Sequence, residues 1–328
     1  MPDATPLVSD QEIDPCQEFL AATGVAGWRR EPLAGDASGR RYERLWGPEG
    51  RTAILMDAQA EPDSVAPFLS IGQHLLSLDL CAPKVLARDG GLLLIEDLGF
   101  SHMAGWLDRQ PDDTRLLYGV AVDVLGRLQP APPPEGLVAL TPLRAAGMIA
   151  PLWEHYAPDT DPRLAAEVTG RLREVLEVHA GTPSVLALRD YHAENLVWRP
   201  EREGTDRLGL LDFQDALLAP PEYDLASLLR DARRDTGDEL RTAMMRRFAE
   251  ATGREDAQVT AAAAVLGLQR NLRILGIFAR LAHERGKPGY LALMPRVHAH
   301  IRADLEHPAL SPMADLIGRA VPPPEVRS

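Results

Sequence analysis

Three polar residues in the second half of the chain have the types and the spacing that phosphoryl transfer needs. Asp190 and Asn195 lie in the segment LRDYHAENLVW, and Asp212 follows the apolar run LGLL. In such a reaction one carboxylate meets the attacking hydroxyl, while an amide oxygen and a second carboxylate hold Mg²⁺ against the phosphates. We therefore predict that Asp190 is the catalytic residue and that Asn195 and Asp212 are the metal ligands.

Short apolar runs surround these residues and predict how they are positioned. VLAL precedes the loop that carries Asp190, NLVW ends it, and LGLL follows after the charged turn 200–206. Two short strands joined by a tight turn form an antiparallel pair. Such a pair would bring Asn195 and Asp212 to the same side of the site.

The same segments carry a family resemblance. DYHAEN (190–195) resembles the catalytic loop of the aminoglycoside phosphotransferase and choline kinase superfamily, which is related to the protein kinases. LDF (211–213) resembles its metal-binding strand end, and PEYDLASLL, which contains Asp224, resembles the segment that follows. The resemblance implies a phosphotransferase that uses ATP and Mg²⁺. We expect Asp224 to be a helix N-cap or a structural acceptor rather than a reagent.

The catalytic loop departs from the family pattern at its start. The family usually has His-Gly-Asp, whereas this chain has Leu188-Arg189-Asp190. The loop therefore loses a supporting histidine, while the role predicted for Asp190 is unaffected.

A second departure concerns the lysine that these kinases usually pair with the nucleotide phosphates. In the predicted strand 52–56 the best-aligned residue is Met56, and the following helix, 63–78, offers Gln73 and His74 but no glutamate partner. Either another cation replaces the lysine, or the chain binds nucleotide without catalysis.

The replacement cations lie in a glycine-containing loop between two predicted strands of the segment WRREPLAGDASGRRYERLW. Two glycines allow close backbone approach to an anion, and two guanidinium groups can pair with it. As a bare pattern this is also an ordinary turn. Its resemblance to the family's small-residue loop assigns ATP binding to Gly35, Asp36, Ala37, Ser38, Gly39, Arg40 and Arg41, with Arg40 and Arg41 as the candidate cations.

Further along, 83–87 and 92–95 read as a β-hairpin. Glu96, Asp97 and Leu98 follow and resemble the hinge between the two kinase lobes, whose backbone would meet adenine; a strand leading into a helix is the alternative. After this point strand signals give way to helical spacing over 114–128, 143–156 and 163–178, in addition to an early helix over 12–23.

These patterns predict an α+β, protein-kinase-like two-lobed fold. Residues 1–97 would form a small nucleotide-binding N-lobe with an antiparallel sheet. Residues 98–328 would form a larger, mainly helical C-lobe with the catalytic loop and sugar-binding helices. ATP would lie between the lobes.

Composition agrees with a soluble globular protein of about two domains, because 328 residues are 45% hydrophobic and 25% charged. The net charge of −13 argues against nucleic acid or an anionic membrane as the main partner. The absence of a leader pattern and of a long apolar run predicts a cytoplasmic location. Cys16 and Cys81 are isolated and are expected to be packing residues. The oligomeric state stays open.

The C-terminal part of the sequence indicates which molecule accepts the phosphoryl group. QRNLRILGIFARL followed by GKPGYL resembles one branch of the superfamily, the anomeric kinases for N-acetylmuramate and N-acetylglucosamine of bacterial cell-wall recycling. The resemblance covers most of the chain and implies phosphorylation of the sugar C1 hydroxyl to the 1-phosphate. The alternatives are an aminoglycoside O-phosphotransferase and a catalytically silent nucleotide-binding regulator.

Arg270, Arg273 and Arg280 share one side of this predicted helix, away from its apolar side. They form either a solvated basic face or a substrate contact, in which Arg270 would pair with the lactyl carboxylate of N-acetylmuramate. The residues predicted to bind the acceptor are His192, Glu194, Asp215 and Arg270.

Overall fold

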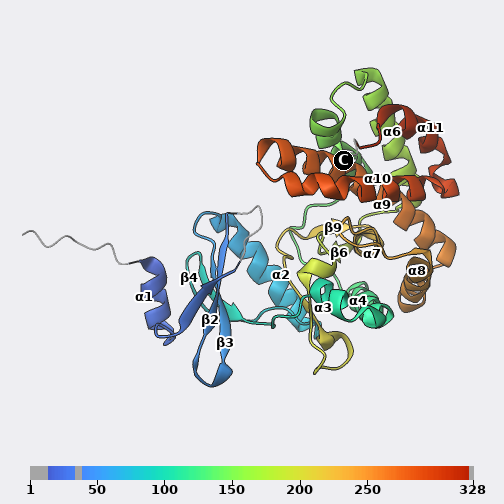
Figure 1. The fold of residues 1–328 in the computed structure, drawn as a ribbon. Coiled ribbons are helices and arrows are strands. Elements are labelled where there is room, and N and C mark those ends of the chain that lie inside the picture. Colours follow the sequence, from blue (N-terminus) through green and yellow to red (C-terminus); the bar gives the residue numbers. More distant parts are fainter. Residues whose placement is uncertain (1–13, 34–38, 325–328) are drawn as a thin grey trace, which may run out of the picture. The chain divides into compact units, whose positions relative to one another are not determined.

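The computed structural model describes residues 14–33 and 39–324, which form two compact units (Figure 1). The first unit comprises the chain up to Leu69 together with Pro83–Leu98, and the second comprises Ser70–Ala82 and the chain from Gly99 onward. Helix α2 (Val65–Ser77) contributes to both. The predicted functional division after residue 97 stays a prediction.

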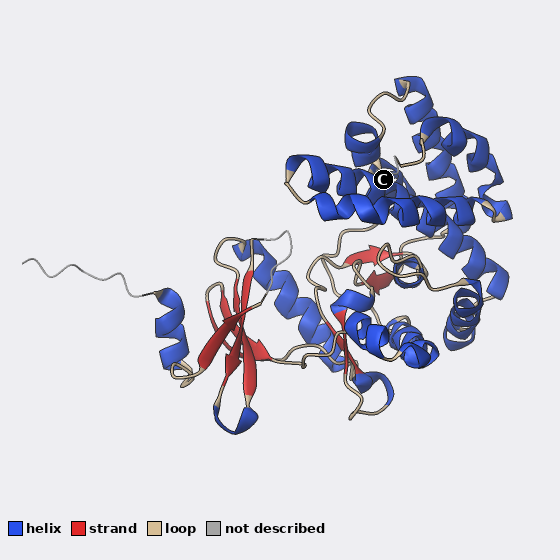
Figure 2. Ribbon diagram, viewed as in Figure 1, coloured by secondary structure: helices blue, strands red, loops and turns tan. Residues whose placement is uncertain are grey.

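The first unit is built on a five-stranded antiparallel sheet (Figure 2), as predicted. Its strands are β1 (Arg29–Pro32), β2 (Arg41–Trp46), β3 (Thr52–Asp57), β4 (Val85–Asp89) and β5 (Leu92–Glu96). The spatial order is β1-β2-β3-β5-β4, and every neighbouring pair is antiparallel. The predicted β-hairpin is the β4–β5 pair.

Helix α1 (Pro15–Ala22) begins where its residue types favour a helix start. Asp14 is the N-cap, its side chain accepts a hydrogen bond from the Cys16 amide at 3.1 Å, and a proline occupies the first turn. The helix packs its apolar face on one side of the sheet, in a core that includes Phe19, Leu55 and Leu94.

Met56, at the position where a lysine was expected, is fully buried. Because successive strand residues point to opposite faces, Met56 lies on the face opposite to Leu55 and α1. It is paired with Tyr42 on β2 and Leu93 on β5. The apolar side chain of Met56 therefore fits this position. It packs within the sheet where the family usually has a lysine.

The second unit is mainly helical, and two short antiparallel strand pairs lie within it (Figure 2). Its further helices are α3 (Met103–Arg109), α4 (Thr114–Leu128), α5 (Pro142–Gly147), α6 (Pro162–His179), α7 (Tyr223–Leu229), α8 (Asp238–Thr252), α9 (Asp256–Glu284), α10 (Met294–Leu305) and α11 (Ala314–Ala320). Its strands are β6 (Val185–Ala187), β7 (Leu196–Trp198), β8 (Leu208–Leu210) and β9 (Leu217–Ala219); β6 pairs with β9, and β7 with β8. The α+β kinase-like organisation is thus confirmed.

Helix α9 forms the centre of the second unit. It packs against α6, α7, α8 and α10, and its side chains Val265, Leu268, Leu272 and Leu275 are completely buried. By length and composition α9 is apolar enough to cross a membrane, but 72% of that apolar window is buried inside the protein. Its hydrophobicity is explained by its place in the core.

The helices predicted over 114–128 and 163–178 are confirmed as α4 and α6. The single helix predicted over 143–156 is wrong, because α5 ends at Gly147 and a separate π-helical turn follows over Leu152–Tyr156. Pro151 lies between them and cannot donate the backbone hydrogen bond that a continuous helix requires.

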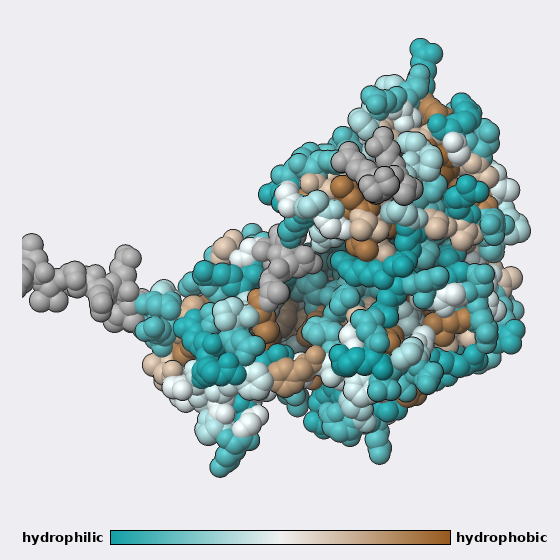
Figure 3. Space-filling model, in the orientation of Figure 1, coloured by the Kyte–Doolittle hydropathy of each residue, from teal (hydrophilic) through white to brown (hydrophobic). Residues whose placement is uncertain are grey.

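The face shown in Figure 3 is mainly hydrophilic, with apolar residues in small scattered areas. The large exposed apolar side chains come from separate places in the sequence, among them Leu86, Phe100, Val138, Leu143 and Val178. Single exposed apolar residues are normal on a protein surface and indicate no binding patch.

The packing of α9 yields a stability prediction. A Cβ atom added to Gly276 would lie 2.2 Å from the Pro151 carbonyl carbon, which is backbone and cannot rotate away. Gly276→Ala should therefore lower the free energy of unfolding by about 1–3 kcal/mol, measured by urea denaturation.

Gly170 supplies the matched control, since it is exposed on α6 and an added Cβ would meet nothing within 4 Å. Gly170→Ala should raise the free energy of unfolding by about 0.5–1 kcal/mol through helix propensity. Equal stability of the Gly276→Ala and wild-type proteins would contradict the packing described.

Candidate active site

The β7–β8 pair brings Asn195 and Asp212 together, as the sequence predicts. Asn195 ends a single 3₁₀ turn immediately before β7, and Asp212 lies two residues after β8. The Leu211 amide donates to the Asn195 carbonyl at 3.0 Å, which extends the strand pairing to the site. The Asn195 Nδ2 atom lies 2.9 Å from the Asp190 carbonyl and 3.5 Å from Asp212 Oδ2. The three predicted residues therefore converge.

The donor set suits Mg²⁺. Asp212 offers carboxylate oxygens and Asn195 offers an amide oxygen, which are the hard ligands this ion prefers. No cluster of three His, Cys, Asp or Glu side chains able to hold a metal occurs among the described residues. A site with two protein ligands is nevertheless sufficient for Mg²⁺ that is also held by substrate phosphates. Gln214, which sequence reasoning missed, donates to Asp212 Oδ1 at 2.8 Å and orients the carboxylate.

The backbone that leads into Asp190 is held in an unusual conformation. Arg189 has φ +74°, in the left-handed region that favours glycine. The Asp224 carboxylate accepts the Leu188 amide at 2.6 Å and the Arg189 amide at 3.0 Å. These bonds hold the turn although its residue is not glycine. Asp224 is the structural acceptor that the sequence suggested, and its position in the first turn of α7 excludes the N-cap role.

The Asp224 carboxyl is 3% exposed, and burial raises its pKa from 3.8 to about 6, although the two amide bonds act in the opposite direction. A buried charge of this kind requires partners. The two amides and the nearby guanidinium group of Arg270 supply them.

Arg270 supports the same turn from α9. Its Nη1 atom donates to the Arg189 carbonyl at 3.0 Å and to the Tyr223 hydroxyl at 3.1 Å, and its guanidinium group lies over the Tyr223 ring, 5.1 Å from the centroid. Ser227 Oγ also donates to the Arg189 carbonyl, at 3.4 Å. Arg270 is 7% exposed, so the solvated basic face is wrong for this residue.

The other arginines of the predicted face differ from Arg270. Arg273 is partly buried, and only Arg280 is exposed. Burial lowers the pKa of Arg270, but the larger combined effect of the Tyr223 hydroxyl and nearby carboxylates raises it. The hydrogen bonds of Arg270 Nη1 are made to the protein. The contact between Arg270 and the substrate stays a prediction.

Three further contacts hold the loop of Asp190 and the adjoining β7 from the helical side. The Tyr191 hydroxyl donates to the Ala121 carbonyl of α4 at 2.8 Å, and burial raises the tyrosine pKa well above its ordinary value. His102 Nδ1 lies 2.6 Å from the Glu194 carbonyl, and the Trp198 amide donates to the Ser101 carbonyl at 2.7 Å. These contacts join residues far apart in the chain, and no local sequence signal indicated them.

The residues predicted to bind the acceptor have different surroundings. Burial lowers the pKa of His192, and its Nδ1 atom is buried without a hydrogen-bond partner among the described residues. Glu194 and Asp215 are exposed, and Asp215 Oδ1 lies 3.8 Å from Arg189 Nη1. His192 and Glu194 lie in the loop of Asp190, Asp215 lies three residues after Asp212, and the predicted role of all three stays a prediction.

Of the loop predicted to bind ATP, Gly35, Asp36, Ala37 and Ser38 lie outside the described residues. The Gly39 amide donates to Glu61 Oε1 at 2.6 Å, and Arg40 Nε lies 3.8 Å from the other oxygen of the same carboxylate. Arg41 pairs with Asp57 at 2.6 Å, and this hydrogen bond raises the arginine pKa. Both candidate replacements for the lysine thus have carboxylate partners within the first unit.

The predicted hinge residues follow β5. Arg44 of β2 makes a two-pronged ion pair with Asp97, with distances of 2.7 and 3.2 Å, and the Asp97 side chain is 2% exposed. The Glu96 amide donates to the Lys84 carbonyl at 2.8 Å, and Leu98 is buried. The Asp97 carboxylate is thus bound by Arg44, and the contact of this segment with a nucleotide stays a prediction.

The fold has close counterparts among solved structures. A choline/ethanolamine kinase family protein from Mesorhizobium loti superposes with a TM-score of 0.63 at 16% identity, covering 92% of this chain and 97% of its own. An aminoglycoside 2′-phosphotransferase gives 0.63 at 15% identity, covering 84% and 93%. These likenesses define the fold as that of the kinase-like phosphotransferases.

Sequence comparisons identify the family of the chain. The phosphotransferase enzyme family matches residues 29–259. A protein named N-acetylmuramate/N-acetylglucosamine kinase from Caulobacter vibrioides is 36% identical over 93% of this chain and 95% of its own length. A protein of the same name from Pseudomonas putida is 33% identical, with 86% and 85% covered. The chain belongs to the phosphotransferase enzyme family.

The environment of Asp224 predicts a specific pH dependence of stability. Since its folded pKa, about 6, lies above its ordinary value of 3.8, the folded state binds more protons between these values. The stabilising contribution of this group is complete below pH 3.8 and is lost as the pH rises through about 6. Asp224→Asn removes this titration, so the free energy of unfolding of the wild type should fall relative to that of the variant between pH 4 and pH 7.

Urea unfolding of both proteins at several pH values checks this expectation. Asp159→Asn, which alters an exposed carboxylate of the same unit, should keep a constant difference from the wild type. A pH-independent difference in the free energy of unfolding between the Asp224→Asn and wild-type proteins would show that the pKa of the Asp224 carboxyl is not shifted on folding.

Proposed function

We propose that this protein is an ATP-dependent kinase that phosphorylates the anomeric hydroxyl of N-acetylmuramate and of N-acetylglucosamine. The observation that carries the proposal is the convergence of Asp190, Asn195 and Asp212 at the ends of β6, β7 and β8. Family membership supports phosphotransfer, and the names of the relatives at 33–36% identity support the two sugars.

In this reaction the C1 oxygen of the sugar attacks the γ-phosphorus of ATP, and the bond from that phosphorus to the β,γ-bridging oxygen breaks. The products are the sugar 1-phosphate, ADP and the proton of the hydroxyl. Asp190 accepts the hydrogen bond of the attacking hydroxyl and orients its lone pair. A carboxylate is a weak base compared with a sugar alkoxide, so its main contribution is positioning, and the proton moves late in a loose transition state.

Asn195 and Asp212 would hold Mg²⁺ through their amide and carboxylate oxygens. The ion supplies charge neutralisation for the β- and γ-phosphate oxygens. Gln214 keeps the Asp212 carboxylate oriented through its 2.8 Å hydrogen bond. Preorientation of this kind lets the ligands bind without rearrangement.

For nucleotide binding we propose the first unit, with the loop 35–41 at the phosphates and the backbone of 96–98 at the base. Arg40 and Arg41 remain the candidates for the cation that replaces the lysine at Met56. Each would have to share its charge with Glu61 or Asp57. We place the reaction in the cytoplasm, where ATP is available, as a step in the recycling of cell-wall amino sugars.

The purified protein should be incubated with ATP, Mg²⁺ and, in separate reactions, N-acetylmuramate, N-acetylglucosamine and kanamycin. We expect sugar-dependent ADP release and a phosphorus NMR signal coupled to the anomeric proton. A product from kanamycin alone would favour an aminoglycoside kinase. ATP binding without phosphorylation of any acceptor would favour a silent regulator, for which the buried Met56 would be the explanation.

Asp190→Asn tests the proposed role of the carboxylate. Because asparagine keeps the shape but not the charge, kcat should fall by about 100-fold or more, while ATP binding measured by calorimetry stays within about threefold. Asp159→Asn on the exposed surface should keep wild-type kcat. An Asp190→Asn enzyme that retained most of its kcat would refute the role.

A further inference from the structure

Three arginines gather around the turn that precedes Asp190. Arg189 is in the turn itself, and Arg270 and Arg273 are one helical turn apart on α9. Residues three apart on a helix lie on the same face, so the Arg273 side chain projects next to that of Arg270. Guanidinium groups repel one another, and such a gathering requires compensating negative charge.

Arg270 is bound to the protein through its Nη1 atom, which donates to the Arg189 carbonyl and to the Tyr223 hydroxyl. Arg273 differs. It is partly buried, and it makes no hydrogen bond or ion pair with any residue in the described ranges 14–33 and 39–324. An arginine withdrawn from water without a partner is costly unless a ligand supplies one.

Arg189 has spare donor capacity as well. Its Nε atom is buried without a hydrogen-bond partner in the described part of the chain, and the contact of Nη1 with exposed Asp215 is long, at 3.8 Å. Arg189 also occupies a left-handed backbone position, φ +74°, where glycine would be relaxed. A strained position that keeps a large charged side chain suggests that the side chain is used.

The electrostatic surroundings of Arg273 also favour a bound anion. Burial lowers its pKa, and the positive charges of Arg189 and Arg270 lower it further, while Tyr223 and Asp190 oppose them. Arg273 thus lies within electrostatic reach of both the catalytic loop and the other two arginines. An anion bound here would relieve the repulsion.

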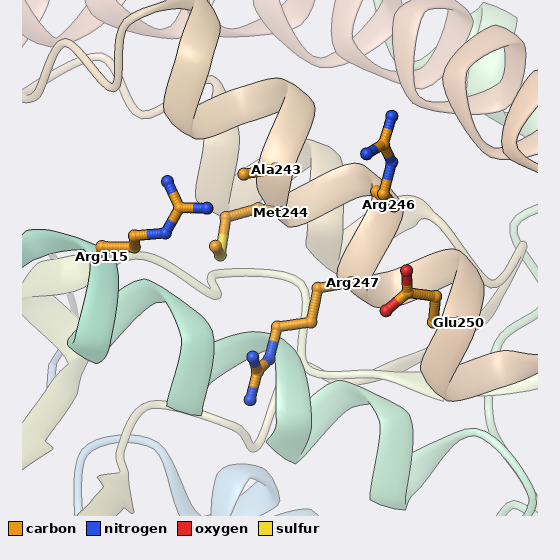
Figure 4. Close-up of a pocket in the computed structure, with 6 residues that line it drawn as sticks. All are labelled: Arg115, Ala243, Met244, Arg246, Arg247 and Glu250. Carbon is orange, nitrogen blue, oxygen red and sulfur yellow. The ribbon is translucent and has the colours of Figure 1, made fainter.

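The arginines beside a surface hollow of about 260 Å³ between α4 and α8 do not share these properties. Figure 4 shows Arg247 reaching from α8 toward α4. There Arg247 pairs with both oxygens of Asp123, at 2.7 and 2.6 Å. Arg115 lies 3.7 Å from Glu239, and Arg246 lies 3.9 Å from Asp256. Arg247 is satisfied by the Asp123 carboxylate, and Arg115 and Arg246 are exposed to water, so this hollow has no comparable demand for an anion.

We propose that Arg273, together with Arg189, binds the carboxylate of the acceptor sugar. The inference rests on the proposed function, in which one acceptor, N-acetylmuramate, differs from N-acetylglucosamine by a lactyl ether that ends in a carboxylate. The two guanidinium groups form charge-assisted hydrogen bonds with that carboxylate. They thereby make the enzyme favour the charged sugar.

The transferred phosphoryl group is another anion that passes this site. The residues proposed to hold its Mg²⁺, Asn195 and Asp212, are at the ends of β7 and β8. Arg273 instead projects from α9 beside Arg270. Arg270 in turn bonds the Tyr223 hydroxyl and the carbonyl of Arg189 in the loop.

Arg273→Ala tests the inference with the two sugars as internal controls. Loss of a hydrogen-bonded charge pair should raise KM for N-acetylmuramate by about 10- to 100-fold. KM and kcat for N-acetylglucosamine should stay within about twofold, which also shows that the variant is folded. Arg273→Lys, which keeps the charge, should recover part of the loss, and Arg280→Ala on the exposed side of α9 should change neither sugar's constants.

Arg189→Gly provides an independent arm, because glycine adopts φ +74° without strain and keeps the amide and carbonyl contacts of the turn. It should raise KM for N-acetylmuramate more than KM for N-acetylglucosamine, without lowering the melting temperature.

Four outcomes would overturn the inference. Equal losses of kcat with both sugars in Arg273→Ala would assign the arginine to the phosphoryl group. Unchanged constants for N-acetylmuramate would leave it without a ligand role. If the wild-type enzyme phosphorylated N-acetylglucosamine but not N-acetylmuramate, the carboxylate site would be refuted and the kinase function would be kept. If it phosphorylated neither sugar, the proposed function would be refuted as well.

Discussion

The site depends on two hydrogen bonds from the Leu188 and Arg189 amides to one buried carboxylate, that of Asp224. These bonds connect the first turn of α7 to the end of β6, and they hold Arg189 in a left-handed conformation that costs a non-glycine residue about 1–2 kcal/mol. That conformation sets the direction in which the next residue, Asp190, leaves the strand. The position of Asp190 is therefore determined by a residue 34 positions later in the chain.

The burial of Asp224 is tolerated because its partners are arranged in layers. The amides satisfy the carboxylate directly, and Arg270 neutralises its charge from α9 while bonding the Arg189 carbonyl. Helix α9 in turn is fixed by the core of the second unit, where Gly276 allows its backbone to approach Pro151 closely. A long apolar helix thus serves two purposes: one side fills the core, and the other carries the cations of the site.

The arginines show how identical side chains acquire different roles. Arg44, Arg247 and Arg270 have partners that the protein itself supplies, and they act as structural cross-links. Arg273 is partly withdrawn from water and has no such partner within residues 14–33 and 39–324. Because desolvating a charge is unfavourable unless it is paired, this contrast separates cross-linking arginines from one that is available for a ligand.

Much of the fold could be predicted because its signals are local. Alternating and helical apolar spacing predicted the antiparallel sheet, α4 and α6, and the runs NLVW and LGLL predicted that Asn195 would meet Asp212. By itself the sequence determined the residue types of the site and their order, because reactive groups and strand periodicity are written in consecutive residues. Only the tertiary structure decided that Arg270 is buried, that Asp97 is bound by Arg44, and that Arg189 is held in a left-handed turn. Each of these depends on which distant side chain removes a charge from water, and that is fixed by packing rather than by spacing along the chain.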